Sequence, residues 1–247
     1  MLLRNVPPSI HRALRKHDPQ TPPTLRYLYN NRKKIPQGRM LELVTQYVLH
    51  RDGFQIYSNV IVKDAWDHSS ELDIVAVRVN FLTTLSRRLL RFILSPVAHP
   101  IPLRMALLSP YIVVECKQYA VDHTVPLHDI SKILTVANLL LVPSYRILCV
   151  TTSTYSPRCS STSNSLTLID NVQLAAWIIS VCSPLQTKIL LQILFPTFNA
   201  SRSSNAKLVQ IVQAHTSLPR LYFARLLRYL ATVLTIAIPI SLYAVVI

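Results

Sequence analysis

The middle of the chain alternates between two hydrophobic periods, and the longer period predicts helices. Leu41, Val44 and Val48 recur at helical spacing within residues 39–50, and Gly53 stands where the end of such a helix belongs. Helical patterns of the same kind are found at residues 127–141, 171–181, 184–195 and 206–214. These segments predict helices separated by short connections.

Runs of apolar and β-branched residues lie between these helical patterns and predict strands. The predicted strands are residues 54–62, 72–79, 111–115, 145–151 and 166–169. The serine-rich stretch 153–165 is predicted as a loop, and Asp170 is suited to cap the helix that follows it. The alternation predicts an α/β domain with a mixed central sheet flanked by helices.

The first 35 residues differ in composition from this domain and are predicted to form a separate basic leader. Up to Arg39 the chain carries nine lysines and arginines against one acid, Asp18. Paired prolines, at positions 7–8 and 22–23, prevent one continuous helix. An arginine-rich, acid-poor start with interspersed leucines is typical of a mitochondrial presequence, and a basic arm that binds nucleic acid is the alternative.

The C-terminal end predicts a membrane anchor at residues 219–247, reached through a helical extension at 182–218. Residues 229–247 are nineteen in number and carry no charge, which is about enough to cross a hydrocarbon core of roughly 30 Å. A buried terminal helix is the alternative. Together, the two ends predict a membrane-anchored protein of the mitochondrion; the alternative is a tail anchor in another membrane, with the domain in the cytosol.

Composition narrows the possible partners and chemistries. The 26 lysines and arginines against 11 acids give a formal charge of +15, which favours a polyanionic partner, either nucleic acid or an anionic membrane surface. With two glycines in the chain, neither a Walker A loop nor a dinucleotide-binding glycine motif is present. The four cysteines form no C-x-x-C pair, so neither a zinc ribbon nor a small disulfide scaffold is indicated.

Charged residues interrupt two of the predicted strands near one end. Asp73 follows Leu72 in one strand, and Glu115 and Lys117 lie in another, on the same face because strand side chains alternate. If the two strands are neighbours, two carboxylates and an ammonium meet at one end of the sheet. Such a group suits a hard cation such as Mg²⁺, and a cross-strand salt bridge at a solvated sheet edge is the structural alternative.

These residues resemble the motif of a known nuclease superfamily. Glu42 on a first helix, then Asp73, then Glu115-x-Lys117 is similar to the PD-(D/E)xK restriction-endonuclease-like superfamily. Longer stretches resemble its Mrr-type branch, of type IV restriction endonucleases. The matching stretches are Gly38-Arg39-Met40-Leu41-Glu42 with Gly53-Phe54, Val114-Glu115-Cys116-Lys117-Gln118-Tyr119, Cys149-Val150-Thr151-Thr152 and Leu168-Ile169-Asp170-Asn171-Val172-Gln173-Leu174. The resemblance covers residues 36–181.

The resemblance implies a restriction-endonuclease-like fold and a DNA phosphodiesterase that needs Mg²⁺ or Mn²⁺. Asp73, Glu115 and the backbone carbonyl of Cys116 would be the metal ligands, and Lys117 would be catalytic. Glu42 would assist the metal through water, and Gln118 would line the same site. Cleavage of both strands would usually need a homodimer.

The resemblance also implies an insertion at about residues 81–110, which must leave the sheet and return to it. This insertion carries four arginines among leucines and would either lie on a membrane or DNA surface or simply pack on the fold. Lys132, Arg146 and Arg158 are expected to contact phosphates. In the main alternative function, the fold is a catalytically inactive module that tethers DNA to a membrane.

Overall fold

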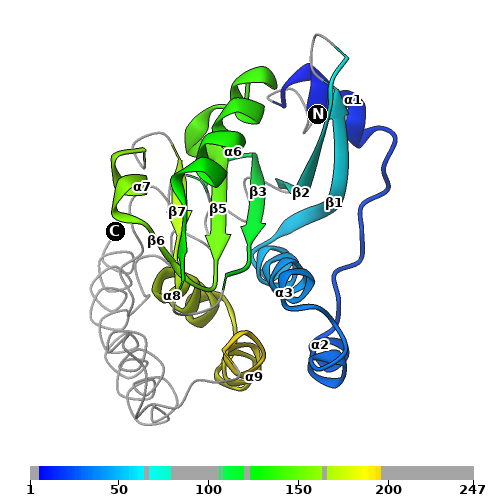
Figure 1. Ribbon diagram of the computed structural model, residues 1–247. Coiled ribbons are helices and arrows are strands. Elements are labelled where there is room, and N and C mark those ends of the chain that lie inside the picture. The colour runs from blue at the N-terminus through cyan, green and yellow to red at the C-terminus, as the bar shows by residue number, and fades with distance from the viewer. Residues whose placement is uncertain are drawn as a thin grey trace, which may run out of the picture.

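The protein is an α/β structure built on a five-stranded mixed sheet (Figure 1). The computed structural model describes residues 6–63, 67–78, 106, 108–119, 123–162 and 166–195. The strand order is β1-β2-β3-β5-β7. These strands are β1 (Phe54–Lys63), β2 (Ser69–Arg78), β3 (Tyr111–Lys117), β5 (Ile147–Thr151) and β7 (Thr167–Ile169). The first three pair antiparallel and the last three parallel, so the predicted mixed sheet is confirmed.

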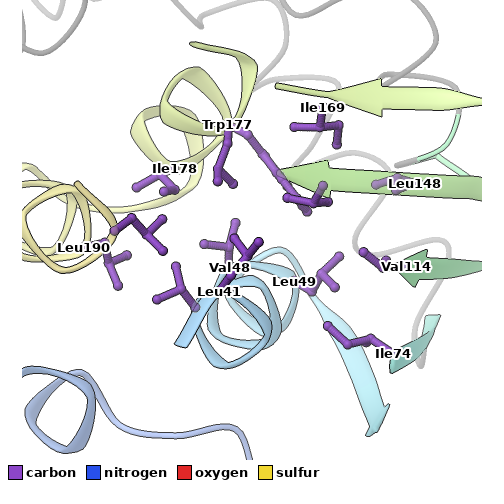
Figure 2. Packing of buried hydrophobic residues seen from close by; sticks show 14 of the residues in the cluster. Leu41, Val48, Leu49, Ile74, Val114, Leu148, Ile169, Trp177, Ile178 and Leu190 are labelled. Atoms are coloured by element: carbon purple, nitrogen blue, oxygen red, sulfur yellow. The ribbon is translucent and has the colours of Figure 1, made fainter. Parts of the chain in front are cut away.

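One face of the sheet is covered by helices from both ends of the described chain. These helices are α2 (Leu25–Asn31), α3 (Gln37–Arg51), α8 (Asn171–Val181) and α9 (Pro184–Leu194). Figure 2 shows Leu41 and Val48 of α3 with Trp177 of α8 and Leu190 of α9, beside inward side chains of the strands. The predicted helices at 39–50 and 171–181 are confirmed. The predicted extension at 182–218 begins as α9, which is part of this core.

The opposite face is covered by α1 (Pro8–Leu14) and α6 (Leu127–Leu139), with α7 (Pro157–Thr162) beside α6. Along β3, Ile112 and Val114 face the α3 side, whereas Tyr111 and Val113 face the α6 side. This alternation is the period of two that a strand buried on both faces requires. Both faces of the sheet are therefore buried by apolar contacts.

The N-terminal residues differ from the expected separate leader, because they pack on the domain. Val6, Ile10 and Leu14 are buried in the same cluster as strand residues of β1 and β2. The backbone N–H of Gln20 donates to the carbonyl of Ile56 at the free edge of β1. The paired prolines do interrupt the helix, but the pieces they leave each have an apolar face that the sheet and α3 cover. The presequence itself stays a prediction.

Part of the predicted loop at 153–165 is ordered into short elements. β6 (Thr154–Tyr155) pairs with β4 (Thr124–Val125) in a parallel two-stranded sheet, and α7 follows. A two-residue strand shows no period, and serine favours turns in isolation, so the sequence carries no signal for these elements.

Several predicted segments lie outside the described residues. The insertion at 81–110 does so except for Ala106 and residues 108–110, and so do the helix at 206–214 and the anchor at 219–247. Among the described helices, none is long and apolar enough to span a bilayer.

Candidate active site

The sheet topology brings the two charged strands together. β2 pairs antiparallel with β3, and the register places Ile74 opposite Val114. Asp73 and Glu115 are the next residues beyond this pair, so they lie at the same end of adjacent strands. The condition that the sequence argument set for a shared site, that these two strands are neighbours, is met.

Asp73 lies where the β1–β2 ladder is distorted. Asn59 of β1 has a φ of 53°, in the left-handed region, and the paired positions run from Ser58–Ile74 directly to Val60–Leu72. Asn59 and Asp73 therefore lie between two paired positions of the ladder and are not paired themselves. Asparagine tolerates this conformation better than most side chains do. The distortion leaves Asp73 near the end of β3 instead of in regular pairing with β1.

The Asp73 carboxylate is bound to the backbone of β3. The N–H of Cys116 donates to Asp73 Oδ2 over 2.7 Å. Burial raises the pKa of Asp73, and this hydrogen bond and the charge of Lys117 only partly offset it. In a strand, the N–H and C=O of one residue point to the same neighbour. The Cys116 carbonyl, expected to bind metal, therefore points toward the strand that carries Asp73.

Glu115 and Lys117 form an ion pair on the α6 side of β3. Lys117 Nζ lies 2.8 Å from Glu115 Oε1, and the two side chains keep 32% and 17% of their surface exposed, so solvent reaches both. Burial, followed by the charge of Asp73, raises the pKa of Glu115. Burial lowers the pKa of Lys117, but the hydrogen bond and charge of Glu115 outweigh it, and the net pKa is raised. Lys117 is thus a cation at neutral pH, which suits charge stabilisation better than proton abstraction.

Glu42 reaches the same end of the sheet from α3. It pairs with Arg39 one turn earlier in the helix. Burial raises the pKa of Glu42 despite this partner, and the charge of Asp73 raises it further. Gln118 lies beside the first turn of α3, since a Cβ built on Gly38 would be 3.7 Å from its Cβ. We call Glu42, Asp73, Glu115 and Lys117 the carboxylate–lysine site.

The donor set of this site fits a hard divalent cation. The charge of Asp73 raises the pKa of both Glu42 and Glu115, and the charge of Glu42 raises that of Glu115 further, so a cation bound among them would relieve this repulsion. In the described part of the chain, no three His, Cys, Asp or Glu side chains converge as a ready ligand group. Asp73, Glu115 and the Cys116 carbonyl would hold the ion and Glu42 would act through water, because Mg²⁺ usually keeps several waters.

The structure adds three residues to the surroundings of this site: Arg39, Glu71 and Asp129. The sequence predicts a role there for none of them. Arg39 neutralises Glu42, and its spacing of three residues on a predicted helix is the signal that could have identified it. Asp129, in the first turn of α6, accepts a hydrogen bond from the Tyr119 hydroxyl. Glu71 and Asp129 line a cavity of about 180 Å³ beside Glu115 and Lys117.

The three basic residues expected to contact phosphates lie in three different parts of the fold. Lys132 of α6 lines the cavity beside Lys117. Arg146 precedes β5, at the end of the sheet away from Lys117, and its guanidinium lies 4.6 Å from the Tyr111 ring centroid. Arg158 is exposed on α7. Of the three, Lys132 lies next to the carboxylate–lysine site.

We expect Asp73→Asn to stabilise the metal-free protein at neutral pH. The folded-state pKa of Asp73 is raised from 3.8, so the stability it contributes is present below that value and is lost as pH rises through the folded pKa. Asparagine keeps an acceptor for the Cys116 N–H without the charge. In EDTA, the melting temperature of the variant should exceed that of the wild type by a few degrees at pH 7.5, and the difference should narrow toward pH 4.

Asp67→Asn is the control for this prediction, because Asp67 is 79% exposed and pairs with Lys63. It should leave the melting temperature and its pH dependence unchanged. A lower melting temperature for Asp73→Asn at pH 7.5 would show that the Asp73 charge is structural.

Comparison with known proteins adds little to this geometry. No protein-family model matches the chain, and no curated protein matches it. A crystal structure described as a protein of unknown function, AF1548, is 12% identical, with 73% of this chain and 96% of that chain covered and a TM-score of 0.41. A likeness at this TM-score supports no functional conclusion. Any functional conclusion therefore depends on the carboxylate–lysine site.

Proposed function

We propose that this protein is a divalent-metal-dependent nuclease, similar to Mrr-type restriction endonucleases, that hydrolyses phosphodiester bonds in DNA. The observation that carries the proposal is the meeting of Asp73, Glu115 and Lys117 at one end of two adjacent strands, with Glu42 beside them. Burial raises the pKa of Glu42, Asp73 and Glu115, and the Asp73 charge raises it further in both glutamates, so the group is costly in a merely structural role. A bound cation would offset this cost.

Each residue has a role that its surroundings support. When bound, Mg²⁺ or Mn²⁺ would supply charge neutralisation at the phosphate and a more acidic water. Asp73, Glu115 and the Cys116 carbonyl would hold the ion. Lys117, kept protonated by Glu115, stabilises negative charge on the phosphoryl oxygens and orients the attacking water. Gln118, which follows β3 and lies beside Gly38 of α3, would line the site from the α3 side.

Nicking of supercoiled plasmid by the full chain tests the proposal. We expect nicking in Mg²⁺ or Mn²⁺, none in EDTA, and none with Asp73→Asn or Glu115→Gln, because each variant removes one ligand charge. Asp67→Asn should nick at the wild-type rate. Metal-dependent nicking that persists in both site variants would place the activity elsewhere and refute the proposed site.

The second candidate is a catalytically inactive module that tethers DNA to a membrane. One observation favours it: Glu115 and Glu42 already have cationic partners, and the described residues contain no ready group of three metal ligands. The plasmid experiment separates the two candidates. DNA that is shifted in a gel but never cut in either metal, with the variants binding equally well, supports the tether.

The location and assembly of the protein are proposed from the sequence. We propose that it is held at a mitochondrial membrane by residues 219–247 and that two copies act together when both DNA strands are cut.

A further inference from the structure

The surface of α2 and of the turn that follows it is basic and contains no acid. Arg26, Arg32, Lys33 and Lys34 are all exposed, and the sequence contains no acidic residue between Asp18 and Glu42. Among the residues that the structure describes, no carboxylate forms an ion pair with any of these four cations. We call these four residues the α2 basic surface.

The helix that carries this surface is anchored in the core. Leu28 is fully buried in the core beneath α2, which packs against both α3 and α9. The Thr24 side chain accepts a hydrogen bond from the Tyr27 N–H and so caps the start of the helix. The backbone that carries these cations is therefore fixed before a partner binds, so little backbone freedom is lost on binding.

Arg32 is the most strongly fixed of the four. Its guanidinium lies 4.0 Å from the Tyr29 ring centroid, and Nη1 donates to the Tyr29 carbonyl over 2.7 Å. A guanidinium has five N–H donors, so most remain for an anion. A stacked guanidinium with outward donors suits a phosphate group.

The α2 basic surface lies near the carboxylate–lysine site. Lys34 is five residues from Arg39, a span of at most about 18 Å even when extended. Thr24 and Leu25, at the start of α2, line one cavity with His50 and Arg51, at the end of α3. The two helices are thus antiparallel, and Arg32 to Lys34 lie at the end of α3 that carries Glu42.

The surface lacks what a membrane-binding helix needs. An interfacial helix buries a continuous apolar face, with residues such as Trp, Phe and Leu, below the headgroups. In α2, Leu28 is buried and Leu25 packs against the core, and the exposed large side chains are two tyrosines, Tyr27 and Tyr29. Charge without an insertable apolar face favours nucleic acid over a bilayer.

We propose that the α2 basic surface binds the sugar–phosphate backbone of duplex DNA and positions it at the carboxylate–lysine site. The choice of DNA as the partner rests on the proposed function. The existence of an exposed basic surface on α2 does not depend on that function. Phosphate contacts of this kind set orientation without reading sequence.

The test compares two triple variants of the full chain that remove the same charge. One is Arg32→Gln/Lys33→Gln/Lys34→Gln on the α2 basic surface. The other is Arg12→Gln/Arg15→Gln/Lys16→Gln, whose residues are equally exposed but belong to α1 and its end, far from α2 in Figure 1. Binding to a 30-base-pair duplex is measured by fluorescence anisotropy at several salt concentrations, after circular dichroism has confirmed that both variants fold.

The α2 variant should lose roughly tenfold or more in affinity, and its slope of log K against log salt should fall by roughly 2 to 3, at about 0.9 per lost phosphate contact. The α1 variant should stay within about twofold of the wild type. Equal losses in the two variants would show a general charge effect and overturn the proposal. So would an α2 variant that binds DNA normally but loses binding to phosphatidylserine vesicles.

This result is independent of catalysis. If the wild-type chain never cuts DNA but the α2 variant alone loses binding, the proposed nuclease activity fails and the docking surface stands. If the wild type cuts DNA and the α2 variant binds and cuts as well as the wild type does, the activity stands and the docking surface fails.

Discussion

Replacing Lys117 with alanine should lower the single-turnover rate of DNA cleavage by about 10²–10³-fold, the typical effect of removing one group that stabilises transition-state charge. Lys117 lies 2.8 Å from Glu115, and its raised pKa keeps it protonated at neutral pH. Single-turnover conditions with saturating enzyme separate this loss from any change in DNA binding. Lys117→Arg keeps the positive charge but changes its geometry, so its cleavage rate should lie between those of the wild type and Lys117→Ala.

Lys132→Ala is the matched control for this prediction. Lys132 lines the same cavity from α6, but it is exposed and forms no ion pair with Glu115 in the described part of the chain. Its loss should change the cleavage rate by no more than a few-fold. If Lys132→Ala is the slower variant, the reacting phosphate lies toward α6 and the role given to Lys117 is wrong.

The elements that the sequence predicts well are those with a long, regular period. The predicted 171–181 agrees with α8, and the Asp170 side chain accepts from the Gln173 N–H over 2.8 Å as the cap requires. Gly53 follows α3 with a φ of 87°, as expected of the residue that ends a helix. In these cases a local signal and the tertiary contacts agree.

The elements that were missed are short and depend on tertiary contacts. α1 and α2 have seven residues each, too few for a helix to be stable alone in water. The segment that contains them is basic and rich in proline, so its composition does not indicate that each helix has a small apolar face. A composition-based boundary at residue 35 therefore separated the start of the chain from a core to which it contributes.

The candidate site also has a part that the sequence predicts and a part that depends on tertiary contacts. Alternation along a strand is enough to place Glu115 and Lys117 on one face, and the structure agrees. The distortion of the β1–β2 ladder at Asn59 and the hydrogen bond from the Cys116 N–H to Asp73 depend on how the three strands meet. No period or motif in the sequence specifies such details, although they set the charge balance of the site.

Replacing Ile10 with alanine should lower the free energy of unfolding by about 2–5 kcal/mol, the usual cost of truncating a large buried side chain. Ile10 is fully buried, and its cluster includes Val60 and Val62 of β1. Such a loss is a large part of the 5–15 kcal/mol that stabilises a typical domain. Urea unfolding of the full chain, followed by circular dichroism, measures it as a lower midpoint with little change in slope.

Arg12→Ala, at an exposed position of the same helix, is the control and should change the free energy of unfolding by no more than about 0.5 kcal/mol. The contrast between the two variants decides whether the start of the chain belongs to the domain. If both leave stability unchanged, residues 6–35 do not support the fold, and a separate leader is correct. If Ile10→Ala alone is destabilising, a chain that begins at residue 36 would expose the apolar surface that α1 covers and should aggregate.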